Sequence, residues 1–560
     1  MSRHRAASLS LTAALIGITT ASAHGQPKAD RIFINGVVWT GMPNQAFAQA
    51  LATRGDKLVA VGTNDQARAL SGPTTEIINL NGHLVVPGFN DAHWHLETRA
   101  QADLAGAASV AEIRRRLTAF AKANPTSPWI LGNGWSYTDF PGSLPERKYL
   151  DDLFPDRPVY ITERDGHMGL ANSKAIAIAG VTPKTQNPVN GRIERDANGN
   201  LTGEFKEYAQ QLIRSHIPGP GAGEVMAAIK DATRRAASFG LTSLQIASAI
   251  SPTALAAIER LQASGDLKVR FRVAVPFDKS PTPAALHRYT SLKNRYPGPV
   301  IKFGIAKGML DGTVDAKTAA MFQAYVGTTE DTGIPMWSQP ELNQSALAYD
   351  KAGIQIELHA IGDKAIHMAL DAYANAAGQN GTSGRRHRIE HVEVPLEADF
   401  PRFKQLGVIA STQALFANPD ATALDHFAVL LGPDRASRAE AFKRFDDAGA
   451  VQAFGSDYPV FSMEVLKGIF AAVTRTTPEG TPAGGWFPEN RISVEAALRH
   501  FTADGAFASF DETTKGTLEA GKLADFVVLT DNILTAPPAR ILTTKVIRTV
   551  MGGKDTHQVP

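Results

Sequence analysis

Two histidines separated by a single residue stand at the end of an apolar run, in "VVPGFNDAHWHLE" at residues 85–97. Side chains on a β-strand alternate between its faces, so His93 and His95 would point the same way, about 7 Å apart along the strand. Both imidazoles could then reach one cation above the strand end, while Trp94 would point outward. Considered alone, the pair is explained equally well by a loop or a polar strand face.

Other residues that could bind a metal follow later apolar runs. They are Lys307 in "IKFGIAKGMLDG", His359 in "IQIELHAIGD", His391 in "HRIEHVEV" and Asp457 in "QAFGSDYPV". Each has an ordinary alternative, since a strand-end histidine can simply form hydrogen bonds, a lysine can extend its charge into water and an aspartate can cap a helix. Ligand binding is the better explanation if all of them lie at the same end of one sheet.

The segments that would position these residues read as eight strands alternating with helical stretches. The strands are "GFNDAHWH", "LTSLQIA", "FRVAVPF", "KFGIAKGML", "GIQIELHAIGD", "HRIEHVEV", "GVIASTQA" and "AVQAFGSDYPV". One helix, "EVMAAIKDATRRAASFG", would bury Val225, Ile229 and Phe239 on one face and end at Gly240. The alternation predicts an α/β fold with a (β/α)8 TIM-like barrel, whose ligands bind at the C-terminal ends of the strands. An open doubly wound sheet is the alternative, but no GxGxxG loop supports it.

Regions outside this alternation predict further domains. Short β-branched runs in residues 27–86 and 510–560 predict a small β-sandwich domain built from both termini. The barrel would take residues 87–509. Within it, about 98–223 form an insertion after strand one, which would lie over the strands' C-terminal ends as a lid or substrate subdomain.

The composition limits the chemistry of any metal site. The 560 residues include no cysteine, so disulfides and thiolate ligands are excluded and any metal must be held by nitrogen and oxygen. Lys and Arg number 57 against 55 Asp and Glu, with no basic patch, so nucleic acid is not expected as a partner.

The first residues predict export rather than part of the fold. Arg3 and Arg5 precede an apolar run and the small residues "ASA", which is typical of a signal peptide over 1–23 with cleavage after Ala23. That run is too short for a membrane span, and no other stretch is long and apolar enough. The mature chain would be secreted across the inner membrane and be periplasmic or extracellular.

The order of the motifs resembles that of the amidohydrolase superfamily. The series "HWH", "AKGMLDGT", "ELHAIGD", "RIEHVE", "FGSDYPV" and "GKLADFVVL" is most similar to the amidohydrolase-3 branch, which includes N-substituted formamide deformylase. "DGHMGLANSKAIAIAG" and "LTGEFKE" in the insertion also look like signatures of that branch. The resemblance covers almost the whole mature chain, and its motifs are specific for fold and metal chemistry but not for substrate.

The resemblance implies a centre with two divalent metals, of which zinc best suits nitrogen and oxygen ligands, with manganese, iron or cobalt as alternatives. The implied ligands are His93, His95, Lys307, His359, His391 and Asp457. Lys307 would bridge the metals as an N-carboxylysine, a carbamate formed with CO2, and Lys302 is the second choice for this role. Asp457 would also be the catalytic proton shuttle.

Four further residues are candidates for contact with the substrate. They are His167, Asn172, Glu204 and Trp94. His167 and Asn172 in "GHMGLANS" could equally order a turn, and Glu204 could lie on the surface. Arg388 and Glu390 beside His391 are expected to support the ligands. Trp135, Trp337 and Trp486 could line a pocket, although core packing is the usual role of tryptophan.

The implied activity is that of a metal-dependent amidohydrolase acting on carbon–nitrogen bonds other than peptide bonds. A metal-activated hydroxide would cleave an amide-type bond in a small molecule such as an N-formyl or N-acyl amine. A cyclic amidine deaminase is an alternative, although "HAIGDKAI" places Asp363 and no glutamate after His359. A non-catalytic periplasmic binding protein on the same scaffold is another, and a homodimer stays open.

Overall fold

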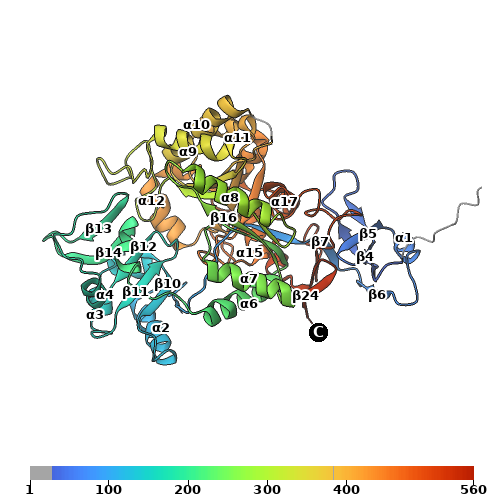
Figure 1. Ribbon diagram of the computed structural model, residues 1–560, viewed down its shortest axis with the longest axis horizontal. Coiled ribbons are helices and arrows are strands. Elements are labelled where there is room, and N and C mark those ends of the chain that lie inside the picture. The colour runs from blue at the N-terminus through green and yellow to red at the C-terminus, as the bar shows by residue number, and fades with distance from the viewer. Residues whose placement is uncertain (1–27, 382–383, 560) are drawn as a thin grey trace, which may run out of the picture.

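The computed structural model describes residues 28–381 and 384–559. The signal peptide predicted over 1–23 lies outside the described residues. Within the described ranges, no helix combines the length and the apolar character that crossing a bilayer would require. The molecule is elongated, with a central barrel, the insertion at one end and the terminal sheets at the other (Figure 1).

The barrel is a parallel sheet, and the described residues contribute eight strands to it. The strands are β8 (Phe89–Trp94), β15 (Leu241–Ile246), β16 (Arg270–Pro276), β17 (Ile301–Met309), β18 (Gln355–Ala360), β19 (Arg388–His391), β20 (Ile409–Gln413) and β21 (Gln452–Gly455). They lie side by side in chain order from β8 to β21. The first and last strands meet where Asp457 N donates to His93 O at 2.7 Å and His95 N donates to Tyr458 O at 2.8 Å. The predicted barrel is confirmed and the doubly wound alternative is wrong.

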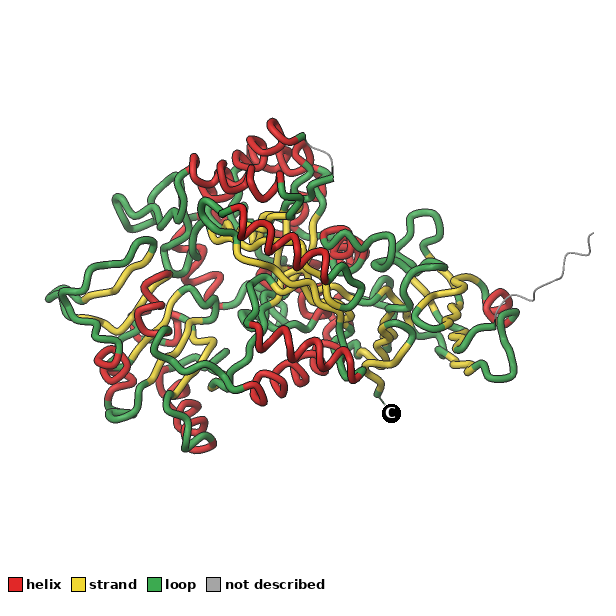
Figure 2. The backbone as a smooth tube through the Cα atoms, viewed as in Figure 1, coloured by secondary structure: helices red, strands yellow, loops and turns green. Residues whose placement is uncertain are grey.

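Helices after the strands cover the outside of the barrel (Figure 2). The main ones are α6 (Ala222–Ser238), α7 (Pro252–Ser264), α8 (Pro283–Arg295), α9 (Gln339–Lys351), α10 (Asp363–Asn380), α11 (Phe400–Leu406), α14 (Phe442–Ala448), α15 (Val465–Thr474), α16 (Val494–His500) and α17 (Ala503–Ala508). Helix α6 buries Val225 and Ile229, as its periodicity predicts, whereas Phe239 is its C-cap and only half-buried. These apolar faces hold the strands, and with them the strand ends, in place.

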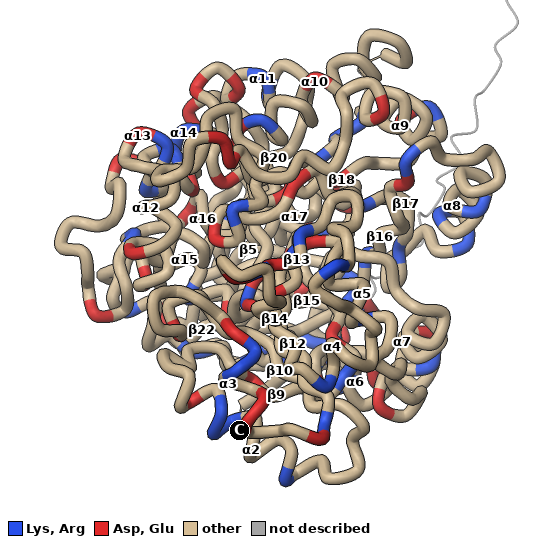
Figure 3. Tube along the Cα trace, turned by 90° about the vertical axis from the view of Figure 1, so that its left-hand side faces the viewer, with Lys and Arg blue, Asp and Glu red and all other residues tan. Residues whose placement is uncertain are grey.

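The insertion after β8 forms a sheet of its own. Its strands are β9 (Ala102–Asp103), β10 (Ile130–Trp135), β11 (Val159–Glu163), β12 (Met168–Ala171), β13 (Gly191–Arg195) and β14 (Leu201–Glu207), in the order β13-β14-β12-β11-β10-β9. Helices α2 (Val110–Ala123), α3 (Lys148–Asp151), α4 (Ser173–Ile178) and α5 (Gln211–Arg214) accompany it. Acidic and basic positions are interspersed over this end of the molecule (Figure 3).

Strands from both termini pair at the other end. One sheet has the order β24-β23-β22-β7-β2-β3 and joins β2 (Val37–Trp39), β3 (Phe47–Ala48) and β7 (Leu84–Pro87) to β22 (Phe526–Leu529), β23 (Val546–Met551) and β24 (Lys554–Gln558). A second sheet holds β1 (Arg31–Ile34), β4 (Ala50–Arg54), β5 (Lys57–Gly62) and β6 (Glu76–Asn79), beside helix α1 (Asn64–Arg68). The two sheets pack together through Phe33 and Phe526, whose ring centroids are 5.0 Å apart. The termini therefore meet as predicted, while the exact domain limits stay a prediction.

Candidate metal centre

His93, His95 and Asp457 come together where the barrel closes. The Nε2 atoms of the two histidines are 3.3 Å apart, and Asp457 Oδ1 lies 3.3 Å from His93 Nε2 and 3.0 Å from His95 Nε2. Asp457 Oδ1 is buried, yet no donor is aligned with it to form a hydrogen bond. Two ring nitrogens and an unsatisfied carboxylate oxygen at these distances suit a cation held between them.

The remaining predicted ligands surround this group. Lys307 Nζ lies 3.4 Å from His93 Nε2. The ring of His391 is 4.8 Å from that of His93 and 4.5 Å from that of His359, measured between centroids. The structure thus brings all six predicted ligands to the C-terminal ends of the barrel strands, although their role as ligands stays a prediction.

A carboxylate sets the orientation of His93. Glu390 Oε2 accepts a hydrogen bond from His93 Nδ1 at 2.6 Å, and Arg388 donates to both oxygens of Glu390 at 2.9 and 3.0 Å. All three side chains are fully buried. This chain fixes the His93 tautomer and leaves the Nε2 lone pair facing Asp457, which is the supporting role expected for Arg388 and Glu390.

The other two buried histidines of the predicted ligand set are oriented in the same way. His391 Nδ1 donates to Gln413 Oε1 at 3.0 Å, which leaves its Nε2 free to bind a cation. His359 Nε2 donates to the carbonyl oxygen of Gly312 at 3.2 Å, which leaves its Nδ1 free to bind a cation. Each ring therefore has one nitrogen tied to the protein and one without a proton.

Burial shifts four of the predicted ligands toward the protonation states that metal binding needs. It lowers the pKa of His93, His359 and His391 well below the ordinary value, so these imidazoles are neutral near pH 7. Burial also lowers the pKa of Lys307, which raises the fraction of neutral amine able to react with CO2. Lys302, the second choice, lies near the start of β17, donates to Asp511 Oδ1 at 2.6 Å and is not part of the cavity wall.

Two predicted ligands occupy left-handed backbone conformations. His391 has φ 73° and Asp457 has φ 55°. Such conformations cost about 1–3 kcal/mol each for non-glycine residues and persist where the surrounding structure imposes them. Here they turn the chain at the ends of β19 and β21 so that both side chains face the centre.

Asp91 is a buried acid that the sequence analysis missed. It accepts hydrogen bonds from Ser456 N at 2.9 Å and from the Ser456 hydroxyl, and so joins β8 to the end of β21. Burial raises the pKa of Asp91 to about 7. Its position two residues before His93, on the same face of the strand, was the available signal, but its partner lies several hundred residues away.

A cavity of about 650 Å³ opens above the centre. The barrel contributes His95, Lys307, His359, His391 and Asp457 to its wall, and the insertion contributes residues that include Tyr160, Thr162, Arg164, Asp165 and His167. The insertion therefore covers the strand ends, where a lid or substrate subdomain was expected.

His167 is the predicted substrate contact that reaches this cavity. Its ring lies 4.7 Å from that of His359, and its Nδ1 is 2.8 Å from Glu207 Oε2. Burial alone would lower the pKa of His167, but the Glu207 carboxylate, together with Asp165 and Asp311, outweighs burial and raises it. A proton on this ring would make it a donor facing a substrate.

Asn172 has a structural position instead. Its Oδ1 accepts from Ala175 N at 3.0 Å as the N-cap of α4 and from Val159 N at 2.9 Å, and its Nδ2 donates to two backbone carbonyls. It is not part of the cavity wall. Because every polar atom of Asn172 is already bonded, the turn-ordering alternative describes it and the substrate contact does not.

Glu204 and Trp94 also lie away from the cavity wall. Glu204 is buried, contrary to the surface alternative, and accepts a hydrogen bond from the Tyr137 hydroxyl within the insertion. Trp94 is fully buried on the outer side of β8, where its ring stacks on Tyr458 at 5.9 Å. Neither is placed to contact a substrate bound at the centre.

Comparison with known proteins agrees with this geometry. The model of the Amidohydrolase family matches residues 76–557. Protein LONG AFTER FAR-RED 3 of Arabidopsis thaliana is 32% identical over 94% of this chain and 92% of its own, and N-substituted formamide deformylase of Arthrobacter pascens is 26% identical over 94% and 97%.

Among solved structures, an uncharacterised metal-dependent hydrolase from Pyrococcus horikoshii OT3 is 25% identical, with a TM-score of 0.70 over 91% of this chain and 99% of its own. The family match spans both the barrel and the terminal sheets, and it includes every residue of the centre described above. The chain therefore belongs to the amidohydrolase family.

Proposed function

We propose that this protein hydrolyses a non-peptide carbon–nitrogen bond of amide type, as in an N-formyl or N-acyl amine. Membership of the amidohydrolase family supports a hydrolase. The observation that carries the proposal is the buried, unsatisfied oxygen of Asp457 beside two ring nitrogens at the floor of a large cavity. Such a carboxylate is placed to exchange protons with a reactant above it.

We infer that the centre would hold two divalent cations, with zinc the best match to its nitrogen and oxygen donor atoms. His93, His95 and Asp457 would hold one, His359 and His391 the other, and Lys307 would lie between them as a carbamate. Cations bound there would supply Lewis acidity, lowering the pKa of water toward about 7 and polarising a carbonyl oxygen. The neutral state of the buried imidazoles supports this assignment.

The protein's own groups then move the proton and position the substrate. Asp457 takes a proton from the attacking water and gives it to the leaving nitrogen, which departs as an amine. His167, held by Glu207 at the cavity wall, donates a hydrogen bond to the substrate's carbonyl side. The insertion reduces the access of bulk water to these groups, which strengthens both interactions.

Asp457→Asn tests the proton transfer. We expect kcat to fall about a thousandfold or more, because asparagine cannot accept the proton, while most of the bound metal remains because the amide oxygen can still coordinate. The measurements are metal content by mass spectrometry and hydrolysis of a panel of N-formyl and N-acyl amines. Asp434→Asn, at an exposed position, is the matched control. An unchanged kcat in Asp457→Asn would refute the role.

The same panel of amides distinguishes the proposed amide hydrolase from a deaminase and from a non-catalytic binding protein. A cyclic amidine deaminase would release ammonia and leave the amides intact. In the structure, Asp363 accepts from Phe322 N at 2.8 Å and takes no part in the cavity wall, so it does not replace the missing glutamate. A binding protein without activity would hold metal and turn over none of the panel.

A further inference from the structure

A second, smaller pocket adjoins the cavity above the centre, and Arg164 and Asp165 belong to the walls of both. Its volume is about 50 Å³, which is room for a few non-hydrogen atoms. Its wall comes from the loop after β11 in the insertion and from loops after the barrel strands β17, β19, β20 and β21. The pocket therefore lies at the mouth of the barrel, where a bound substrate could extend.

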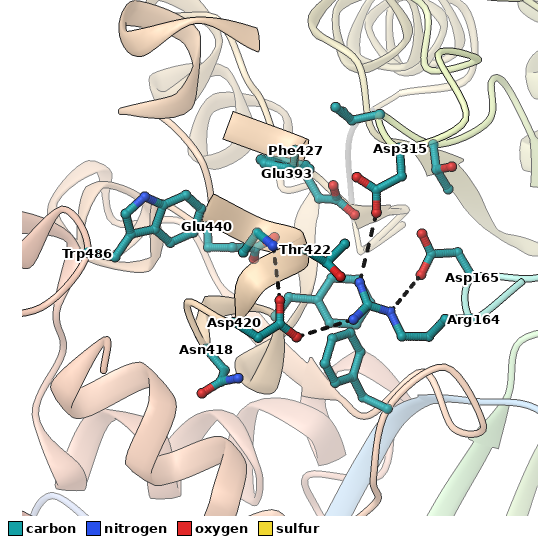
Figure 4. Close-up of a pocket in the computed structure, with 15 residues that line it drawn as sticks. Arg164, Asp165, Asp315, Glu393, Asn418, Asp420, Thr422, Phe427, Glu440 and Trp486 are labelled. Atoms are coloured by element: carbon teal, nitrogen blue, oxygen red, sulfur yellow. Dashed lines mark hydrogen bonds and ion pairs between the residues drawn. The ribbon is translucent and has the colours of Figure 1, made fainter. Parts of the chain in front are cut away.

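Five of the fifteen residues that line this pocket are acidic (Figure 4). They are Asp165, Asp315, Glu393, Asp420 and Glu440. Among the described residues that line it, Arg164 is the one cation. Its guanidinium lies between three acids, at 3.5 Å from Asp165, 3.9 Å from Asp315 and 3.3 Å from Asp420. A second buried cation, Arg475, donates to the backbone carbonyl oxygen of Glu440 at 2.8 Å, so the five acids are accompanied by two arginines.

Several oxygen atoms in the pocket are buried without a partner. Asp315 is 6% exposed and Glu440 is 4% exposed, and one carboxylate oxygen of each forms no hydrogen bond, like the hydroxyl of Thr313. Burial raises the pKa of Asp315 and of Glu440 to about 8. Figure 4 shows the carboxylate of Glu393 close to that of Asp315. Both carboxyls are therefore mostly protonated near pH 7 while the pocket is empty, and a cation beside their unpaired oxygen atoms would favour the ionised form.

Aromatic rings decide which kind of cation fits. Phe416, Phe427, Phe461 and Trp486 line the same pocket. Arg164 lies over the ring of Phe461 at 4.5 Å and Arg475 over that of Trp486 at 5.3 Å, so Phe416 and Phe427 are the rings left to a ligand. Glu163, Asp165 and Asp315 could in principle surround a metal ion, since their oxygen atoms lie within 4.8 Å of one another. A metal ion needs oxygen ligands or water on every side, whereas ring faces attract an organic ammonium, whose remaining contacts are apolar. Mixed carboxylates and rings therefore suit an alkylammonium group.

One of these rings connects the pocket to the proposed catalytic centre. Phe416 lines the pocket and stacks on His391, with ring centroids 6.3 Å apart. Asp165 lies on the same boundary, in the wall of both spaces. A group held in the small pocket would therefore be separated from a bond at the centre by a short alkyl chain.

We propose that this pocket binds an ammonium group of the substrate, so that the preferred substrates are amides carrying a positive charge, such as mono-acylated alkyl diamines. The inference rests on the proposed amide hydrolysis and adds the class of substrate. The ammonium would pair with Asp315 or Glu440 and pack against the rings of Phe416 and Phe427.

The first experiment compares two isosteric amides on the metal-loaded enzyme. One is an N-formyl alkyl diamine, and the other has a methyl group in place of its ammonium. We expect kcat/KM for the cationic amide to be at least about tenfold higher, mainly through KM. Equal values, or a preference for the neutral amide, would refute the ammonium pocket while leaving amide hydrolysis intact.

The second experiment does not depend on turnover. Calorimetric titration with n-butylammonium should show saturable binding to the wild-type enzyme, with 1-butanol as the neutral control. Binding should weaken at least about tenfold in Asp315→Asn and in Glu440→Gln, but not in Asp434→Asn. Saturable n-butylammonium binding without hydrolysis of any amide would count against the proposed function but not against the pocket.

Two results would overturn the pocket itself. One is the absence of saturable n-butylammonium binding to the wild-type enzyme. The other is a Ca²⁺ ion bound in addition to the catalytic metals and lost in Asp315→Asn, which would make the acids a metal site. Since the wild-type titrations need no variant, the proposal stays testable even if Asp315→Asn fails to fold.

Discussion

At the scale of single residues, the two lysines of β17 lie in different surroundings. Lys307 faces His93 inside the barrel, while Lys302 bonds Asp511, in the segment that follows α17. Burial alone would raise the pKa of Asp511, but Lys515 and Lys302 outweigh it and hold that pKa at about 2. The same side-chain type therefore serves two unrelated purposes five residues apart.

We predict opposite effects for the two substitutions. Lys307→Ala should lower metal content and reduce kcat by about a hundredfold or more, because the group proposed to bridge the metals is gone, with little change in unfolding free energy. Lys302→Met should keep metal and activity. Metal analysis and steady-state kinetics on both variants check this, and full metal content in Lys307→Ala would contradict the bridging carbamate.

Lys302→Met should instead change the pH dependence of stability. Because the folded pKa of Asp511 lies below its ordinary value of 3.8, its ion pairs stabilise the fold above pH 4, and that contribution is lost as pH falls toward 2. We expect a loss of about 1–2 kcal/mol at pH 7, shrinking as Asp511 becomes protonated. Urea unfolding at several pH values measures it, and a pH-independent difference would contradict this explanation.

The sequence predicted the residues of the centre far better than those around it. His93, His95 and Asp457 follow strands in a recognisable order, so strand alternation and family resemblance were enough. Asp91 and the acids of the second pocket acquire their environment only through partners distant in the chain. The motif of Asn172 left turn ordering and substrate contact equally open, because the backbone groups that its side chain bonds cannot be identified from the sequence.

At the scale of secondary-structure elements, the packing of β21 against β8 depends on one glycine. A Cβ atom at Gly455 would lie 2.5 Å from His93 N and 2.6 Å from His93 Cβ, which is closer than atoms can approach. The two strands can therefore meet at the proposed centre only if this position has no side chain.

Gly455→Ala should therefore displace His93 and lower both metal content and activity by about tenfold or more. The overpacking should also lower the free energy of unfolding by about 1–3 kcal/mol. Gly378→Ala is the matched control, since a Cβ at that helical position in α10 meets nothing within 4 Å. Alanine there should be neutral or slightly stabilising. Metal content and thermal unfolding of the two variants give the comparison, and wild-type metal binding in Gly455→Ala would show that the strands can separate freely.

The strands themselves were predictable because each is a short apolar run followed by polar residues. The arrangement of the insertion was harder to predict from the sequence. Its runs "SPWILGNGW" and "RPVYITERDGH" are recognisable as β10 and β11, but nothing local indicates that the loop after β11 contributes to the walls of two pockets.

At the scale of the whole molecule, a buried ion pair joins the terminal sheets to the barrel. Arg270, the first residue of β16, donates to both oxygens of Asp525 at 2.8 and 2.9 Å, and both residues are 5% exposed. Asp525 immediately precedes β22. The pair therefore connects the end of one barrel strand to the sheet in which both termini meet.

Removing one partner should destabilise the protein as a whole. Arg270→Met leaves Asp525 buried without its cation, which we expect to cost about 3–5 kcal/mol. Arg270→Met combined with Asp525→Leu should recover part of this loss, because neither charge remains. Chemical unfolding followed by both fluorescence and circular dichroism measures it, and additive losses in the double variant would contradict coupling through this pair.

Export remains a prediction at this scale, since residues 1–23 lie outside the described part of the chain. Expressed from its full sequence in a Gram-negative host, the protein should accumulate outside the cytoplasm, with residues 1–23 removed and His24 as its first residue. Intact-mass measurement of the fractionated protein decides this, and an uncleaved cytoplasmic product would contradict the leader.

The pairing of the first barrel strand with the last has a consequence for how the enzyme matures. His93 and Asp457 become neighbours only after most of the polypeptide has been synthesised, so the complete set of proposed ligands does not exist in a shorter nascent chain. The complete proposed metal site would therefore form only after the barrel has closed. If the chain crosses the inner membrane before folding, the ions available on the far side, rather than those of the cytosol, determine which metal the finished enzyme carries.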